Sequence, residues 1–245
     1  MNVNYSEELS QAFVVGPDEL KKLIELLQKR IGEVTISVDC IDKIEHKFST
    51  VKELIDYENP KSRRICRIYL SARSNDYSKS ATIIFRDSVS SFSGGISLSI
   101  TAREDVVLRL RDKMLDVVAG TRPWYNPLAC FDLITPKGCV LWVLFSFAVI
   151  ILTALVVFKF GLISGSKEGI ELRDEVRLFI ILPSFIFLIV AYMFLSKPFK
   201  WIFPSGVFTI GQGKSRFETL KRVQWSVVIP SVVSLVVGGL LLIFA

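Results

Sequence analysis

The sequence GCVLWVLFSFAVIILTALVVF occupies residues 138–158 and has no charged side chain between Lys137 and Lys159. A helix of these 21 residues is about 30 Å long at a rise of about 1.5 Å per residue, which matches the hydrocarbon core of a bilayer. Two more uncharged runs follow, at 178–196 and 223–245. Three such runs predict three membrane-spanning helices, because a small domain has little room for three helices that are apolar on all sides.

The positive charge of the chain lies beside these runs. Residues 1–137 carry 20 basic and 19 acidic side chains, whereas residues 138–245 carry 10 and 5. The loop 197–222 has six Lys or Arg residues and one acidic residue, Glu218, while the loop 159–177 is balanced. Basic loops lie on the cytoplasmic side. The sequence therefore predicts a multi-pass protein of the cytoplasmic (inner) membrane with its N-terminus in the cytosol and its C-terminus outside. No duplex DNA binding is expected.

The first half of the chain has the periodicities of a mixed α+β domain. Helical spacing and capping-box patterns predict helices at about 17–31, 51–58 and 102–119, the last two beginning after Thr50 and Thr101. Alternating apolar residues predict strands at 33–41, 44–48, 65–72, 81–86 and 96–100. Residues 1–15 are expected to be a loosely held arm.

The expected architecture is an α+β cytosolic domain, with a mixed and mostly antiparallel sheet, followed by a three-helix transmembrane bundle. The predicted divisions are a sensor domain at 1–121, a membrane-proximal linker at 122–137 and a transmembrane domain at 138–245. Within the last, residues 197–222 form an interfacial segment between the second and third spans.

The inventory of reactive side chains argues against an enzyme. His46 is the only histidine, and no cysteine lies near it at ligand spacing, so neither a metal site nor a serine–histidine pair is expected. Gly213-Lys214-Ser215 resembles the end of a P-loop, but Phe208 occupies the place of the required first glycine. No catalytic residue and no cofactor is expected.

One basic cluster is a candidate ligand-binding site: Lys61, Arg63, Arg64 and Arg67. Guanidinium groups match phosphate oxygens, so this cluster is typical of a site for a phosphorylated ligand. The alternative is a solvated strand edge, which lysine and arginine often protect.

A stripe of small or kinking residues marks the third apolar run, at every fourth position: Ser226, Pro230, Ser234 and Gly238. Small residues at this spacing let helices pack closely. On an oligomer axis the same stripe can line a narrow opening. Both interpretations, helix packing and a pore lining, stay open.

The whole layout, a soluble module followed by a few spans with no enzyme motif, resembles the membrane effectors of bacterial anti-phage defence systems, such as Hailong-type effectors. The resemblance implies a homo-oligomeric gated pore or ion channel that stays closed until the cytosolic domain binds a nucleotide or oligonucleotide signal. Its partners are then the lipid membrane, further copies of the chain and that signal. The alternative function is a membrane-anchored adaptor that recruits a protein partner.

Overall fold

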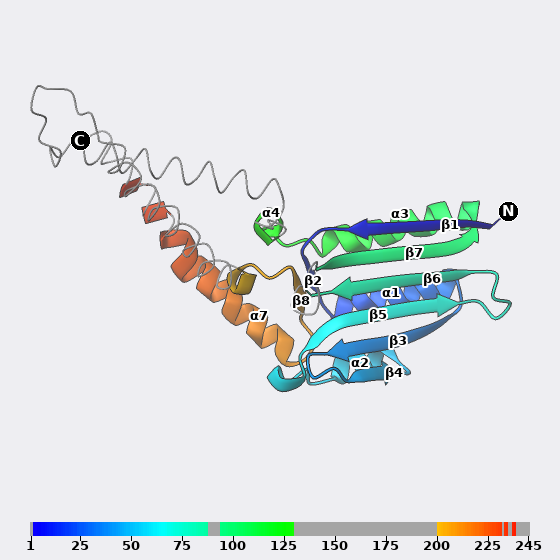
Figure 1. Cartoon of the computed structure of the whole chain (residues 1–245), viewed down its shortest axis with the longest axis horizontal. Coiled ribbons are helices and arrows are strands. Elements are labelled where there is room, and N and C mark those ends of the chain that lie inside the picture. Colours follow the sequence, from blue (N-terminus) through cyan, green and yellow to red (C-terminus); the bar gives the residue numbers. More distant parts are fainter. Residues whose placement is uncertain (1, 88–93, 130–199, 232, 235–236, 239–245) are drawn as a thin grey trace, which may run out of the picture. The chain divides into compact units, whose positions relative to one another are not determined.

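A computed structural model describes residues 2–87, 94–129, 200–231, 233–234 and 237–238 (Figure 1). Its central element is a six-stranded antiparallel sheet with the order β1-β7-β6-β5-β3-β4. The strands are β1 (Asn2–Leu9), β3 (Glu33–Cys40), β4 (Glu45–Phe48), β5 (Ile65–Arg73), β6 (Ser80–Arg86) and β7 (Gly95–Arg103). The prediction of an α+β domain with an antiparallel sheet is confirmed.

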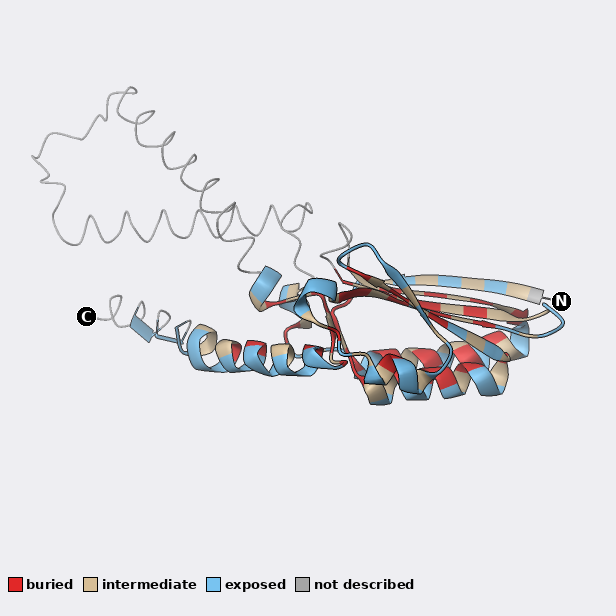
Figure 2. Cartoon of the chain, turned by 90° about the horizontal axis from the view of Figure 1, so that it is seen from below, coloured by how far each residue is buried: buried red, intermediate tan, exposed pale blue. Residues whose placement is uncertain are grey.

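The helices of this domain lie on one face of the sheet. They are α1 (Pro17–Arg30), α2 (Val51–Asp56) and α3 (Glu104–Gly120). Figure 2 shows that the buried parts of these helices lie on the side that faces the strands. Leu20, Leu27, Leu110 and Met114 are among the helix residues in the hydrophobic core. No helix of the described residues covers the opposite face (Figures 1 and 2). The strands alternate accordingly, with apolar residues toward the helices and polar residues toward the uncovered face.

One predicted capping box is confirmed and the other is wrong. The Thr50 hydroxyl accepts a hydrogen bond of 3.2 Å from the Glu53 backbone N–H, and the Glu53 carboxylate accepts one from Ser49, so α2 begins where predicted. At Thr101 the strand β7 instead continues to Arg103, and α3 begins at Glu104. Strand pairing with β1 and β6 at Thr101 outweighs the local capping signal.

The expectation of a loose N-terminal arm is also wrong. β1 pairs with β7 along its full length, from Asn2 opposite Arg103 to Leu9 opposite Ile96. A second strand, β2 (Phe13–Val15), pairs in parallel with β8 (Gly206–Phe208). The N-terminus therefore contributes one edge of the large sheet and half of a two-stranded sheet.

The C-terminal segment is built into the same unit as the sheet. Contacts group the described residues from Ile202 onward with the described residues before Cys130, and Phe208 and Ile210 belong to the hydrophobic core. After β8 come α7 (Gln212–Val223) and a π-helical turn, η2 (Gln224–Val228). At Gly206 any side chain would meet a neighbour, since an added Cβ would lie 2.7 Å from the Phe13 ring.

The structure contradicts the predicted three-helix transmembrane bundle, and with it the membrane and ion-channel assignment and the inner-membrane localisation. Within the described residues, every helix falls short of the length and apolar character that crossing a membrane requires. The runs 138–158 and 178–196 lie outside the described residues, and the run 223–245 is described only in part. The described part of that third run continues α7, whose side chains include Lys214, Arg216 and Glu218, so the helix that contains it begins as a charged one.

Candidate functional site

The structure divides the predicted basic cluster into separate ion pairs. Arg63 is the last residue of a short 3-10 turn, η1 (Lys61–Arg63), Arg64 lies between this turn and β5, and Arg67 is the third residue of β5. Each arginine pairs with a different carboxylate: Arg63 with Asp42 at 3.9 Å, Arg64 with Asp87 at 3.3 Å and Arg67 with Asp39 at 3.2 Å. Lys61 makes no ion pair within the part of the chain that the structure describes. The three arginines therefore need separate consideration.

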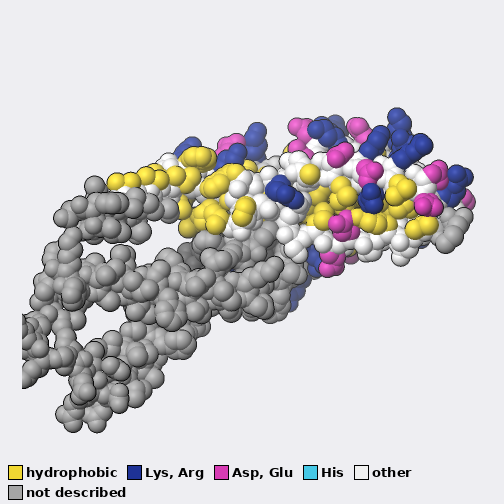
Figure 3. All heavy atoms as spheres, turned by 90° about the horizontal axis from the view of Figure 1, so that it is seen from above, with side chains coloured by type: hydrophobic (Ala, Val, Ile, Leu, Met, Phe, Trp, Pro, Cys, Tyr) yellow, Lys and Arg dark blue, Asp and Glu magenta, His cyan; other side chains and the backbone are white. Residues whose placement is uncertain are grey.

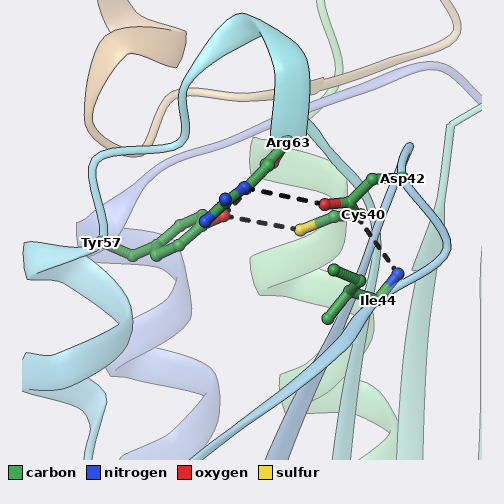
Figure 4. Close-up of polar contacts among 5 residues, drawn as sticks. All are labelled: Cys40, Asp42, Ile44, Tyr57 and Arg63. Atoms are coloured by element: carbon green, nitrogen blue, oxygen red, sulfur yellow. Dashed lines mark hydrogen bonds and ion pairs between the residues drawn. The ribbon is translucent and has the colours of Figure 1, made fainter.

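Arg63 belongs to a structural group beside the β3–β4 turn (Figure 4). The Tyr57 hydroxyl donates to the Arg63 carbonyl at 3.3 Å and lies 3.7 Å from the Cys40 sulfur. Burial, followed by the contact with Cys40, raises the pKa of Tyr57 to about 12, and burial also raises the pKa of the Cys40 thiol. Both groups stay protonated near neutral pH, so this cysteine has the properties of a buried structural thiol and not of a nucleophile.

Arg64 lies in a second group, together with Asp87 and with Arg216 of α7. The Asp87 side chain is 6% exposed and Arg64 is 34% exposed. Burial lowers the pKa of the Arg216 guanidinium, and the charge of Arg64 lowers it further. The Arg216 Nη1 and Arg64 Nε atoms are buried without a hydrogen-bond partner within the described residues. Arg64 thus pairs with the buried carboxylate, Arg216 lies close enough to Arg64 for the two charges to repel each other, and both guanidinium groups keep N–H donors that the described residues leave unused.

Asn59 fixes the start of α7 beside this group. Its amide Nδ2 donates to the Ile210 carbonyl at 3.1 Å, and its Oδ1 accepts from the Ile65 N–H at 2.9 Å. The Gln212 N–H donates to the Glu58 carbonyl at 2.8 Å. These bonds join the residues just before η1 and β5 to the first residues of α7, and they bring Arg216 to Arg64 from a point about 150 residues away in the sequence.

Arg67 lies in a third group, on the uncovered face of the sheet. Its neighbours across the strands are Asp39 on β3 and Arg86 on β6. Arg86 makes no ion pair with any residue that the structure describes. Two like charges directly opposite each other destabilise a sheet. Asp39 pairs with Arg67, and Glu45 on β4 lies opposite Asp39, on the side away from Arg86.

An aromatic cluster lies next to the Arg64 group: Trp124, Tyr125, Phe203 and Trp225. The Tyr125 side chain is buried, and burial together with the nearby charge of Asp87 raises its pKa. Beside it, the Gln224 amide donates to the Ile202 carbonyl at 2.6 Å. This cluster connects the end of the sheet domain to the C-terminal helix at the place where the Arg64 group lies.

The predicted stripe of Ser226, Pro230, Ser234 and Gly238 lies apart from all of these groups. All four residues are exposed in the described part of the C-terminal helix, and a Cβ added to Gly238 would meet nothing within 4 Å. Large apolar side chains on the same helix are exposed too, namely Trp225, Val227, Val233 and Val237 (Figure 3). Neither the packing interpretation nor the pore interpretation finds a partner surface within the described residues.

Sequence reasoning missed Arg86 and Arg216, which complete two of the three groups. Strand alternation in 81–86 places Arg86 on the polar face, so the sequence pattern is sufficient to identify this residue. The contact of Arg216 depends on the long-range docking of α7, for which the sequence has no local signal.

No cluster of three potential metal ligands occurs among the described residues. Comparison with protein-family models, with curated proteins and with solved structures finds no match to this chain.

Proposed function

We propose that the protein is a ligand-binding regulatory module. Its α+β domain binds a phosphate-bearing anion between Arg64 and Arg216, and occupancy of that site controls how firmly α7 is held against the domain. The observation that carries this proposal is the proximity of two partly buried guanidinium groups from distant parts of the chain: Arg216 lies near Arg64, which pairs with the buried Asp87.

The chemistry of the site suits a tetrahedral oxyanion. Arginine offers N–H donors in a planar fork, and bonds from such a fork to phosphate are among the strongest that proteins make. The buried Nη1 of Arg216 and Nε of Arg64 have donors that remain unused by the described residues. A bound anion offsets the repulsion between the two guanidinium groups, and it thereby favours the position of α7 in which they lie together.

The test uses pyrophosphate as the probe and isothermal titration calorimetry of the full chain. Arg216→Gln removes one guanidinium and leaves the Arg64–Asp87 pair intact. We expect it to weaken pyrophosphate binding about tenfold or more, because a hydrogen bond to a charged group contributes about 1.5–3 kcal/mol. Arg222→Gln is the matched control, since Arg222 lies on the same helix and is exposed.

A second measurement follows α7 directly. Amide exchange in residues 212–223 should slow when pyrophosphate binds to the wild-type chain and to Arg222→Gln, and it should not change in Arg216→Gln. The proposal fails if the wild-type chain shows no saturable binding of pyrophosphate, or if Arg216→Gln binds it as tightly as Arg222→Gln does.

An adaptor function is the second candidate, and one observation favours it. Trp225 and Val227 are 59% and 56% exposed on the C-terminal helix, and Val233 and Val237, one helical turn apart, are 54% and 49% exposed. Exposed aromatic and apolar side chains in a group are typical of protein-binding surfaces. Under this hypothesis, Trp225→Ala abolishes partner recruitment and leaves pyrophosphate binding unchanged.

A further inference from the structure

The uncovered face of the six-stranded sheet has a composition unlike that of an ordinary solvated face. Reading across the sheet, the row at its centre contains Ser37, Tyr69, Ile84 and Ser97, each directly opposite the next. The next row toward the far end contains Thr35, Ser71, Thr82 and Ser99. One aromatic ring and one aliphatic side chain therefore have hydroxyl groups at both ends of their row and along one side of it, on a face that no described helix covers (Figures 1 and 2).

The charged row lies on the other side of Tyr69. Arg67 is two residues before Tyr69 on β5, and Arg86 is two residues after Ile84 on β6, directly opposite Arg67. Two residues along a strand span about 6.7 Å. Arg67 is 38% exposed and bonds to Asp39 with Nη1 at 3.2 Å, which leaves its other donors, and all of those of Arg86, without a carboxylate among the described residues.

We propose that this face binds one nucleotide, with its base stacked on Tyr69 and Ile84 and its phosphate held between Arg67 and Arg86. Every base has a flat π-face, and an aromatic side chain on a sheet is a stacking surface for it. The flanking serine and threonine hydroxyls both donate and accept hydrogen bonds, so they satisfy the edge of the base. The negative charge of the phosphate offsets the repulsion between the two arginines, which lie directly opposite each other.

The side chains on this face favour a single nucleotide over a nucleic-acid strand as the ligand. Binding a strand needs a basic track with successive aromatic side chains, whereas Tyr69 is the one aromatic residue in the described rows of this face. Beyond the two hydroxyl-rich rows the next row has Glu33 opposite Arg73, so Arg73 has a carboxylate directly across from it and Arg86 does not. There is room for one base and for one phosphate group.

This site is distinct from the Arg64–Arg216 site. Arg64 pairs with the buried Asp87, while Arg67 pairs with the exposed side chain of Asp39. Alternation along the strand turns Arg67 toward the uncovered face, together with Tyr69 and away from the buried Ile68. The two proposals therefore fail or succeed independently of each other.

The experiment measures binding of adenosine 5′-monophosphate to the full chain by calorimetry. Tyr69→Ala should weaken binding about 5- to 150-fold, the range measured for loss of one base–aromatic stack, and Tyr69→Phe should keep most of the affinity. Arg67→Gln should weaken binding about tenfold or more and should remove the preference for the monophosphate over adenosine.

The chain contains matched controls for both substitutions. Tyr77→Ala removes an exposed tyrosine in the β5–β6 turn, whose ring lies under Arg73 at 5.5 Å. Arg73→Gln removes an arginine from the same strand and the same face, six residues beyond Arg67. Both controls should bind adenosine 5′-monophosphate as the wild-type chain does.

Three results overturn the inference. The first is the absence of saturable binding of adenosine 5′-monophosphate to the wild-type chain. The second is equal affinity in Tyr69→Ala and Tyr77→Ala, with circular dichroism showing both variants folded. The third is binding of a ten-nucleotide oligoadenylate more than a hundredfold tighter than the monophosphate, which assigns the face to single-stranded nucleic acid.

Discussion

Asn59 is the residue on which the docking of the C-terminal segment most depends, and Asn59→Ala tests that docking. The side chain is fully buried, its two hydrogen bonds join Ile65 to Ile210, and its backbone is left-handed with φ of 50°. Losing two buried hydrogen bonds costs about 2 to 3 kcal/mol once their stranded partners are included. Placing alanine in the left-handed region costs about 1 kcal/mol more. We expect the free energy of unfolding to fall by about 3 to 4 kcal/mol.

The assay is urea unfolding of the full chain, followed by far-ultraviolet circular dichroism and by tryptophan fluorescence. Asn59→Gly separates the two contributions, because glycine adopts the left-handed region freely and should recover up to about 1 kcal/mol. Asn4→Ala is the control, since Asn4 is exposed and accepts one hydrogen bond from Thr101 at 3.2 Å. A loss below about 1 kcal/mol in Asn59→Ala would refute the view that this side chain anchors the segment.

Three further predictions concern the same unit. Burial raises the pKa of Tyr125, and its hydroxyl has no hydrogen-bond partner among the described residues. The stability that the neutral Tyr125 side chain contributes is therefore complete below about pH 10 and is lost as the pH rises beyond it. Tyr125→Phe should unfold at a higher pH than the wild-type chain in an alkaline titration followed by circular dichroism. Gly206→Ala should lower the free energy of unfolding by about 2 kcal/mol in urea, because the new Cβ would lie 2.7 Å from the Phe13 ring and 3.0 Å from the Asp87 Cα. Thr50→Ala should cost about 1 kcal/mol and speed amide exchange in α2, since it removes the hydroxyl that caps that helix.

The sheet domain could be predicted because its signals are local. Apolar residues alternate in 33–40, 65–72 and 81–86, and β3, β5 and β6 occupy nearly those ranges. β1 was missed because Glu7 interrupts the alternation of Val3, Tyr5 and Leu9, although Glu7 is less exposed than its neighbours Ser6 and Glu8. Pairing with β7 holds this segment as a strand, although its own sequence does not predict one.

The C-terminal part could not be predicted for the opposite reason. β2 and β8 are three residues each, and their pairing joins positions about 190 residues apart, so no periodicity marks them. The apolar residues around Phe208 and Ile210 are compatible with a membrane surface or with a protein core, and composition alone does not distinguish the two. The same ambiguity between a membrane and a protein core explains why the uncharged run at 223–245 predicts a membrane span.

The division of the basic cluster follows from the geometry of a strand. Successive side chains of β5 point to opposite faces, so basic residues that are neighbours in the sequence serve different surfaces. Arg64, just before β5, meets Asp87 and the C-terminal helix, whereas Arg67 meets Asp39 and Arg86 on the uncovered face. A compact basic motif in a sequence is therefore weak evidence for one binding site whenever it enters a strand.

This geometry also explains why both proposed sites lie at one end of the sheet. β5 begins where β6 ends, so Arg64 and Arg67 at the start of one strand meet Arg86 and Asp87 at the end of the other. The Asp87 N–H bonds to the Cys66 carbonyl at 2.9 Å, and the two strand ends are thereby held together as a unit. The two proposed sites therefore share these paired strand ends, and each has its own pair of arginines, Arg67 with Arg86 on the uncovered face and Arg64 with Arg216 beside α7.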